Sequence, residues 1–213
     1  LRKLPQWQPI MSSSGKEHDD QKDHMMTRSL YRKKVGIHGF GNVARTLFSL
    51  MKPFQVECFV YSKNVPHDFI REHGAIPCEN LKELFSKSEI LAECEALTPE
   101  TEGSVTKEIL HCLPHDAVFV NVGRGAVVDE SALAQLALEE KIFVGSDVFC
   151  KEPLPHDSPF FKTRRALLSP HIAGPTLDSL PDCAKKAFEN LKNFIDGKPL
   201  KNQLTLEGFD RAT

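Results

Sequence analysis

Short apolar segments alternate with amphipathic segments from residue 33 onwards, and this alternation constrains the fold more than any other feature of the sequence. The short segments are apolar on both faces, so they predict parallel strands, and the segments between them predict helices that cover both sides of one sheet. We expect strands over residues 35–39, 56–61, 89–94, 117–122, 142–147 and 166–169, and helices over residues 42–51, 66–73, 79–86, 98–111, 130–140 and 180–195. The pattern predicts an α/β fold with a doubly wound, Rossmann-like parallel sheet, in which ligands bind beyond the carboxyl ends of the strands.

The size and charge of the chain restrict the classes of function that it can serve. Its 213 residues are enough for one large domain, or for one domain with an arm. Its 27 basic and 29 acidic residues give a net charge of −2, which argues against a nucleic-acid partner because phosphate contacts need a basic face. No apolar run approaches the length of a membrane span, so we expect no membrane partner either.

The six cysteines form no Cys-x-x-Cys motif, which favours reduced thiols and a cytoplasmic location. Residues 11–27 are polar and without period, and they predict a solvated loop within a partly mobile N-terminal arm or linker over residues 1–29. The histidines and acids of that loop leave a metal site as a less favoured alternative, and we predict none. Because the chain does not begin with methionine, we expect that part of a larger protein is missing.

A glycine-rich turn joins the first expected strand to the first expected helix. Gly39, Gly41 and Ala44 form the pattern G-x-G-x-x-A, which on its own is also compatible with a simple tight loop. Between a strand and a helix, the first glycine permits the turn, the second lets the backbone approach a pyrophosphate, and the small alanine permits helix–strand contact. The N–H groups and the positive end of the helix dipole favour an anion there, so the turn predicts dinucleotide binding.

The end of the second expected strand lacks the acid that usually binds the adenosine ribose hydroxyls. Ser62 and Lys63 stand at that place instead, and serine can donate to a 2′-phosphate while lysine can pair with it. This favours NADP over NAD as the cofactor. The alternative is that both residues are a solvated strand end and that NAD binds.

Three segments place charged or titratable residues just past the carboxyl ends of later strands. Asn121–Glu130 contains Arg124, Asp147–Pro155 contains Glu152, and Ser169–Thr176 contains His171. Taken singly, each of these residues is compatible with a solvated surface position. Taken together, they predict a site at one rim of the sheet.

These segments, in this order, resemble the D-isomer-specific 2-hydroxyacid dehydrogenases. The resemblance extends from about Leu30 to about Asn202. It includes Leu30-x-x-Lys33, the glycine turn, Leu97-Thr98-Pro99-Glu-Thr101, the three segments above and Gly197-Lys-Pro199-x-x-Asn202. The ordered set is far more specific than any one motif.

The resemblance implies two doubly wound domains with the active site between them, a small 2-hydroxy or 2-keto acid as substrate, NAD or NADP as cofactor, and a homodimer. The catalytic residues of the family fall on Arg124, Glu152 and His171. Its cofactor-binding positions fall on Gly39, Gly41, Asn42, Val43, Thr98, Val122, Asp147 and Gly174. In the oxidoreductase thus implied, the arginine would hold the substrate, the histidine would exchange a proton with it, and the glutamate would orient the histidine.

The chain also departs from the family. Cys94 and Ala96 occupy the places of a usual His-x-Pro. The substrate-side domain is mostly missing, so we expect a dinucleotide-binding domain over 30–176, and a C-terminal helix and tail over 177–213 that return towards the missing domain. Such a chain would have very poor catalysis and would expose an apolar patch. The alternative function is a non-catalytic dinucleotide-binding remnant or a partner-binding protein.

Overall fold

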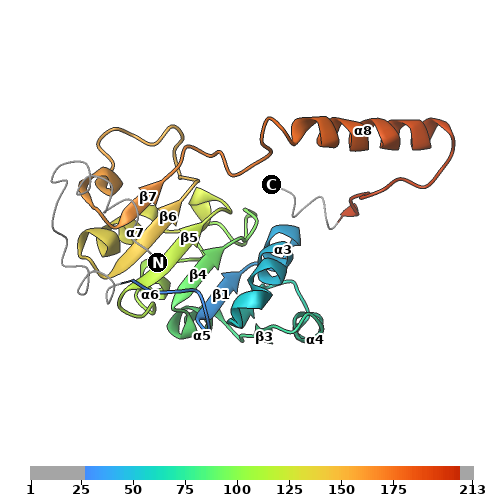
Figure 1. Cartoon of the computed structure of the whole chain (residues 1–213). Coiled ribbons are helices and arrows are strands. Elements are labelled where there is room, and N and C mark those ends of the chain that lie inside the picture. The colour runs from blue at the N-terminus through green and yellow to red at the C-terminus, as the bar shows by residue number, and fades with distance from the viewer. Residues whose placement is uncertain (1–26, 207–213) are drawn as a thin grey trace, which may run out of the picture.

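The computed structural model describes residues 27–206, so most of the arm predicted over residues 1–29, and nearly all of its loop, lie outside the described residues. The described chain forms a seven-stranded sheet in which all neighbouring strands are parallel (Figure 1). The strands are β1 (Lys34–His38), β2 (Glu57–Tyr61), β3 (Ile76–Pro77), β4 (Ile90–Glu93), β5 (Ala117–Asn121), β6 (Ile142–Ser146) and β7 (Ala166–Leu168).

The strand order β3-β2-β1-β4-β5-β6-β7 confirms the doubly wound, Rossmann-like prediction. The order reverses between β1 and β4, and ligands of such sheets bind beyond the strand ends at this point. Every strand predicted from the sequence is present within a residue or two of its expected bounds. The two-residue edge strand β3 was not predicted, because two residues are too few to show any periodicity.

Helices pack on both faces of the sheet. The helices of the described residues that flank the sheet are α3 (Asn42–Met51), α4 (His67–Glu72), α5 (Leu81–Lys87), α6 (Lys107–Leu110) and α7 (Glu130–Leu138), with short 3₁₀ helices at Lys52–Phe54, Gly125–Val127 and Pro159–Lys162. A further helix, α8 (Leu180–Ile195), does not pack on the sheet. Side chains of β1 and β2 such as Ile37 and Val60 form one core cluster with Phe48 of α3. Phe119 and Leu91 face the other side and join α5, α6 and α7 in a second, larger cluster.

The helix predicted over residues 98–111 is wrong for its first half. Residues 99–103 form turns, Gly103 has φ of +62°, and the only helical part is α6, which is capped by the Thr106 side chain. Thr101 turns its hydroxyl back to the Ala96 carbonyl at 2.6 Å and also accepts the Thr98 N–H at 2.8 Å. These local side-chain bonds compete with helical hydrogen bonds and prevent a helix from starting at Thr98.

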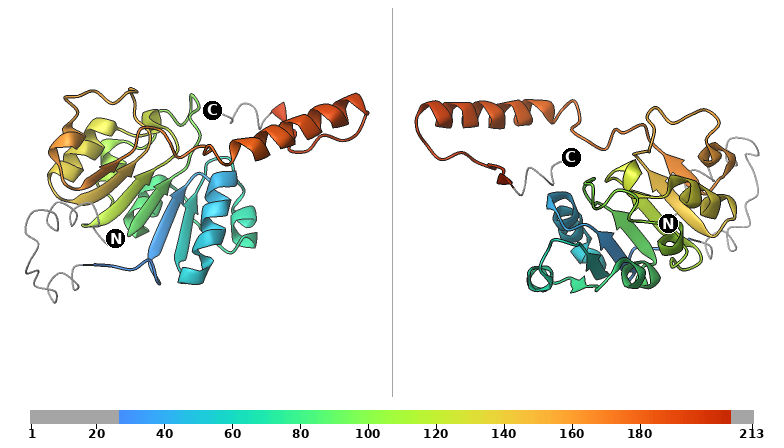
Figure 2. Two further views of the ribbon diagram at one scale, coloured as in Figure 1. Left: turned by 45° about the horizontal axis from the view of Figure 1, so that its top comes forward. Right: turned by 180° about the vertical axis from the view of Figure 1, so that it is seen from behind.

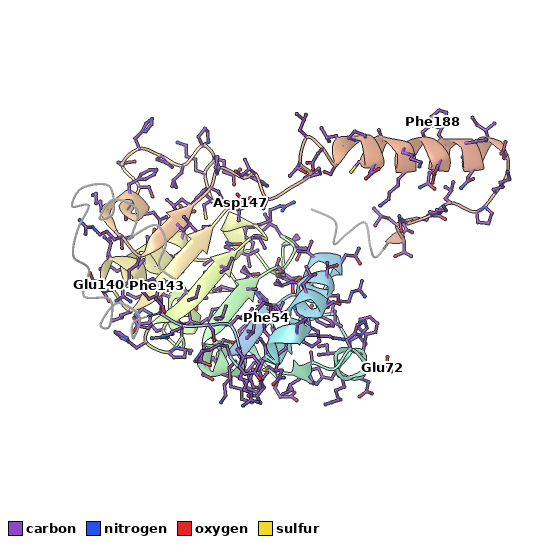
Figure 3. All side chains as sticks on the ribbon, in the orientation of Figure 1. Phe54, Glu72, Glu140, Phe143, Asp147 and Phe188 are labelled. Atoms are coloured by element: carbon purple, nitrogen blue, oxygen red, sulfur yellow. The ribbon has the colours of Figure 1, made fainter. Side chains whose placement is uncertain are left out.

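Helix α8 has the bounds predicted from its apolar spacing, yet it has no buried residue. It projects from the rest of the fold in every view (Figures 1 and 2), and Phe188 lies on it far from the sheet (Figure 3). Its large apolar side chains are exposed, including Phe188, Leu191, Phe194 and Ile195. This confirms the expected apolar patch. Across residues 27–206, no helix is both long enough and apolar enough to cross a membrane.

Candidate active site

The glycine turn after β1 has the backbone geometry that only glycine tolerates. Gly39 has φ of +82°, and a Cβ there would lie 2.7 Å from the Glu95 Cα. The Gly39 N–H donates to the Tyr61 carbonyl at 2.9 Å, which continues the β1–β2 pairing into the turn. The first glycine of the motif is therefore required by its left-handed φ and by its close approach to the loop after β4.

The start of α3 is suited to a phosphate group. Gly41 is the N-cap residue, with no side-chain capping bond and no acidic residue in the first turn of the helix. A Cβ on Gly41 would meet nothing within 4 Å, so a ligand can approach the backbone closely. Asn42 and Val43 are exposed at the first helical positions. The helix N-terminus thus offers backbone N–H donors and a positive dipole end to an anion.

The two residues that favoured NADP in the sequence both face carboxylates. The Ser62 hydroxyl lies 3.4 Å from Glu95 Oε2, and Lys63 Nζ lies 2.9 Å from Glu100 Oε2. The hydrogen bond to Glu100 and its charge raise the pKa of Lys63. Both Glu95 and Glu100 come from the segment after β4, so the sequence near Ser62 contained no signal of them.

A buried ion pair lies directly beneath this region. His38, the last residue of β1, places Nδ1 2.6 Å from Oε2 of Glu93, the last residue of β4. Both side chains are almost completely buried. Burial alone would lower the pKa of His38, but the charge and hydrogen bond of Glu93, with the more distant Glu95, outweigh it and raise the pKa. No motif in the sequence assigns a functional role to this histidine.

Two of the predicted catalytic residues contact each other. His171 Nδ1 lies 2.7 Å from Glu152 Oε2, and the other Glu152 oxygen accepts the Phe149 N–H at 3.0 Å. The hydrogen bond from His171, followed by the one from Phe149, lowers the pKa of Glu152. His171 has φ of +53°, so its backbone is held in a left-handed conformation that is uncommon for histidine. Its Nε2 atom remains on the opposite edge of the ring from the glutamate.

Asp147 fixes the segment that carries His171. Its carboxylate accepts hydrogen bonds from Ser169 Oγ at 2.5 Å and from the N–H groups of Ile172 and Ala173 at 3.0 and 2.8 Å. Its own carbonyl accepts the His171 N–H at 2.8 Å. Although burial would raise the pKa of Asp147, these hydrogen bonds lower it, so the carboxylate stays charged. Figure 3 shows Asp147 where β6 ends.

Arg124 lies in the turn after β5, the neighbouring strand of β6. Its Nη1 donates to the Gly123 carbonyl at 2.9 Å, and its carbonyl accepts from the Asn121 side chain at 3.3 Å. The next residue, Gly125, packs so closely that a Cβ there would lie 2.0 Å from the Phe149 carbonyl carbon. The turn that carries Arg124 is therefore in direct contact with the segment that leads to Glu152.

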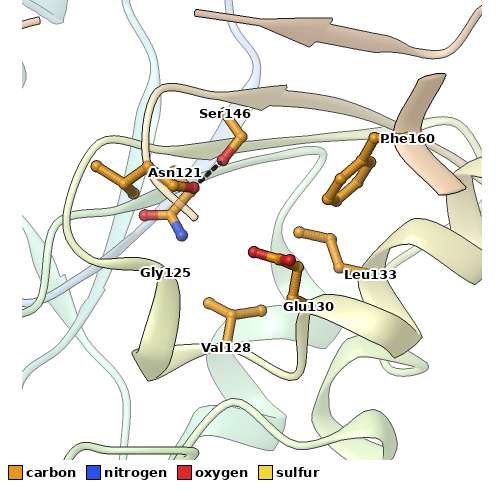
Figure 4. Close-up of a pocket in the computed structure, with 8 residues that line it drawn as sticks. Asn121, Gly125, Val128, Glu130, Leu133, Ser146 and Phe160 are labelled. Atoms are coloured by element: carbon orange, nitrogen blue, oxygen red, sulfur yellow. Dashed lines mark hydrogen bonds between the residues drawn. The ribbon is translucent and has the colours of Figure 1, made fainter. Parts of the chain in front are cut away.

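A small pocket lies behind this contact, between β5, β6 and α7 (Figure 4). Asn121, Gly125 and Glu130 line it, and the Glu130 carboxylate accepts the Cys150 N–H at 2.7 Å. This hydrogen bond from Cys150 to Glu130 helps to hold residues 149–152 in place. The pocket is too small to hold a substrate.

The predicted site residues all lie after the carboxyl ends of parallel strands, which meet at one edge of the sheet. Val122 follows β5 and is partly exposed, Thr98 follows β4, and Gly174 follows β7 with open space around it. The structure joins His171, Glu152 and Asp147 into one hydrogen-bonded group. It joins Ser62 to Glu95, a residue that the sequence analysis missed. In place of the family histidine, burial raises the pKa of Cys94 to about 12, so this thiol is neutral.

The fold and this edge of the sheet define a Rossmann-type dinucleotide-binding domain. The family described as "D-isomer specific 2-hydroxyacid dehydrogenase, NAD binding domain" matches residues 1–173. The chain belongs to the D-isomer-specific 2-hydroxyacid dehydrogenase family, and its match is to the NAD-binding domain of that family. This confirms the resemblance inferred from the sequence.

Individual relatives agree with this assignment. The human glyoxylate reductase/hydroxypyruvate reductase is 31% identical over 183 residues, which are 83% of this chain and 54% of the human protein. Glyoxylate reductase from Aeropyrum pernix is 32% identical over 86% of this chain and 55% of its own length. The chain spans about half the length of these curated relatives.

A solved structure of a D-isomer specific 2-hydroxyacid dehydrogenase from Xanthobacter autotrophicus Py2, in complex with NADPH and MES, superposes with a TM-score of 0.78. It is 28% identical, and the match covers 97% of this chain and 83% of that chain.

Proposed function

We propose that this chain is the cofactor-binding part of an NAD(P)-dependent oxidoreductase that interconverts small D-2-hydroxy acids and 2-keto acids. The observation that carries the proposal is the 2.7 Å contact between His171 and Glu152, at the same edge of the sheet as the glycine turn. The names of the human and Aeropyrum relatives support glyoxylate or hydroxypyruvate as the class of substrate.

The dinucleotide would bind along the carboxyl edge of the sheet. The N–H groups of Asn42 and Val43 would face the pyrophosphate, because the start of α3 has no capping side chain and no acid. Val122, Thr98 and Gly174 would lie beside the cofactor at the ends of β5, β4 and β7. When bound, the nicotinamide cofactor supplies or accepts the hydride, and the protein supplies position and charge.

His171 would exchange a proton with the substrate oxygen. Its Nδ1 is engaged by Glu152, so Nε2 is the atom that would donate to the oxygen during reduction and accept from it during oxidation. Glu152 would orient the ring and stabilise its protonated form. Asp147 would hold the loop of His171 in place through three hydrogen bonds.

Arg124 would bind the substrate. A 2-keto acid presents a carboxylate next to a carbonyl, and the planar guanidinium can donate to both. The close contact between Gly125 and Phe149 would fix the position of this arginine relative to Glu152. In this arrangement Arg124 positions the substrate carbonyl for His171, and residues from three neighbouring strand ends act on one molecule.

Against the preference for NADP predicted from Ser62 and Lys63, both side chains contact carboxylates. The Xanthobacter structure contains NADPH, so a relative of this fold does admit a 2′-phosphate. We therefore propose NAD(P) as the cofactor at the level of the family.

We further propose a cytoplasmic homodimer, supported by six free cysteines and by the exposed apolar residues of α8. The same helix favours a second candidate function, a dinucleotide-binding protein that docks a partner without catalysis. The division into a dinucleotide-binding domain over 30–176 and a C-terminal segment over 177–213 remains part of this proposal.

Turnover assays decide between the two functions. Oxidation of NADH and NADPH by the complete protein that contains this chain would be followed with glyoxylate, hydroxypyruvate and pyruvate. We expect turnover that His171→Gln lowers by about a hundredfold to ten-thousandfold, whereas His156→Gln, an exposed histidine nearby, leaves it unchanged. Measurable cofactor binding without any turnover would refute the catalytic function and favour the partner-docking candidate.

A further inference from the structure

We propose that Glu95 selects the nucleotide, by accepting hydrogen bonds from a free adenosine ribose and repelling a 2′-phosphate, so that the chain binds NAD(H) in preference to NADP(H). The inference rests on the proposed cofactor binding and concerns one residue that the family motifs do not assign. In this chain, the carboxylate missing from the end of β2 would come from the loop after β4.

Glu95 lies at the switch point of the sheet, where the strand order reverses between β1 and β4. A Cβ on Gly39 would lie 2.7 Å from the Glu95 Cα, and a Cβ on Gly123 would lie 2.9 Å from the Glu95 carbonyl oxygen. The Glu95 backbone therefore touches both the glycine turn after β1 and the turn after β5. Any dinucleotide whose pyrophosphate lies on the glycine turn must pass close to this residue.

The side chain of Glu95 points towards the end of β2. Its Oε2 lies 3.4 Å from Ser62 Oγ, and the same atom lies 3.9 Å from His38 Nε2. Rossmann-type domains place the acid that binds the adenosine ribose at the end of the second strand. The Glu95 carboxylate reaches that end in space, although it follows a different strand in sequence.

The orientation of Glu95 is fixed before any ligand binds. Its backbone N–H donates to Glu93 Oε1 at 2.9 Å, and its own Oε1 accepts the Ala96 N–H at 3.1 Å. Glu93 is itself held by the buried contact with His38. The Glu95 side chain is 17% exposed, so a ligand can reach part of it at a defined place. A preorganised acceptor of this kind suits the two hydroxyls of a ribose.

The surrounding charges oppose a phosphate at this place. Glu93, Glu95 and Glu100 contribute three carboxylates, and the two basic groups, His38 and Lys63, are each already paired with one of them. A 2′-phosphate would add further negative charge next to Glu95. Like charges brought together in a partly desolvated site discriminate strongly against the wrong ligand.

Equilibrium binding tests this assignment independently of turnover. Dissociation constants of the full chain would be measured for NADH and NADPH by fluorescence, and for ADP and adenosine 2′,5′-bisphosphate by calorimetry, which isolates the adenosine half. We expect wild-type chain to favour NADH and ADP by about tenfold or more. E95Q should weaken NADH, strengthen NADPH, and so shift their ratio by about tenfold.

Two further variants distinguish a specific contact from a general change in charge. E102Q removes the same charge from an exposed glutamate of the following turn and should leave the ratio unchanged. In the double variant S62D/E95Q, the acid returns to the end of β2, and the preference for NADH should be restored. Restoration also shows that the fold tolerates the E95Q substitution.

A wild-type preference for NADPH, or an E95Q ratio equal to that of wild type, would overturn the assignment while leaving the oxidoreductase proposal intact. Failure of wild type to bind either nucleotide would overturn both.

Discussion

At the scale of single residues, hydrogen bonds fix the side chains of His171, Glu152 and Asp147. His171 is held through its ring by Glu152 and through its backbone by Asp147. The left-handed φ of His171 is uncommon for a residue with a side chain, and the Asp147 hydrogen bonds to the adjoining N–H groups hold the loop in that conformation. Backbone strain of this kind is often found at functional sites.

Replacing Glu152 tests its part in the pair. E152Q keeps the shape of the side chain but removes its charge, so protonated His171 loses its stabilisation and we expect turnover to fall by about a hundredfold. Because the pKa of Glu152 is lowered, the wild-type glutamate stays charged at and above its ordinary pKa, and its contribution disappears only in more acidic solution. The measurement is the pH profile of turnover for E152Q, with D157N, an exposed acid of the same loop, as control. Equal profiles for wild type and E152Q would contradict this role.

The buried pair of His38 and Glu93 makes a separate prediction about stability. The pKa of His38 is raised in the folded chain, so the folded state binds this proton more tightly than the unfolded state does. The resulting stabilisation is complete below about pH 6.5 and is lost as the pH rises through the folded pKa, with a slope of at most about 1.4 kcal/mol per pH unit.

Urea unfolding between pH 6 and pH 9 measures this effect. The free energy of unfolding of wild type should fall with increasing pH more steeply than that of H38Q, whereas the exposed-site control H156Q should follow wild type. Parallel curves for wild type and H38Q would show that the pair does not titrate in this range.

At the scale of elements, close approaches of the backbone connect the strand ends. Gly39 touches the loop after β4, and Gly125 touches the segment after β6, so the turns that carry the site support one another. The turns at the ends of β1, β4, β5 and β6 therefore form a continuous layer. Buried side chains of the strands and of the helices on either face of the sheet form the two core clusters, which hold the strands in place.

Gly125→Ala tests this connection. Its added methyl group would lie 2.0 Å from the Phe149 carbonyl carbon, which is backbone and cannot rotate away. We expect a loss of about 1–3 kcal/mol in the free energy of unfolding, measured by urea denaturation. Gly174→Ala is the matched control, because a Cβ there meets nothing within 4 Å. Equal stability of the two variants would show that the Gly125 contact is not structurally required.

The sequence predicted those elements whose signals are local. Helix α3 begins directly after the glycine turn, and α7 begins after Asp129, a residue type that favours helix starts and whose side chain accepts the Ala132 N–H. The prediction failed at residues 98–106, where Thr101 bonds back to Ala96 and overrides the helix signal. Glu95 was missed for another reason: its partners Ser62 and His38 belong to other strands, and no local periodicity reports such contacts.

At the scale of the whole molecule, α8 stands apart from the rest of the described chain, because none of its residues is buried. Its apolar spacing indicates a helix that packs on a surface, yet Phe188 and Phe194 are 68% and 72% exposed. The chain also spans about half the length of its curated relatives. An exposed apolar face of this size favours association.

Sedimentation velocity tests whether α8 drives self-association. We expect the wild-type chain to form dimers or larger species in a concentration-dependent manner, and the double variant F188E/F194E to shift towards the monomer. Since neither side chain is buried, the variant should keep the fold, which circular dichroism would check. Association that is unchanged in the variant would place the contact elsewhere and remove the support of α8 for a homodimer.

A crystal structure of the chain with NADH would show where the nucleotide binds. We expect the pyrophosphate to contact the N–H groups at the start of α3, the ribose hydroxyls to contact Glu95, and the nicotinamide to face His171 Nε2 with Arg124 beside it. A nucleotide bound elsewhere, or a nicotinamide remote from the His171–Glu152 pair, would contradict this expectation.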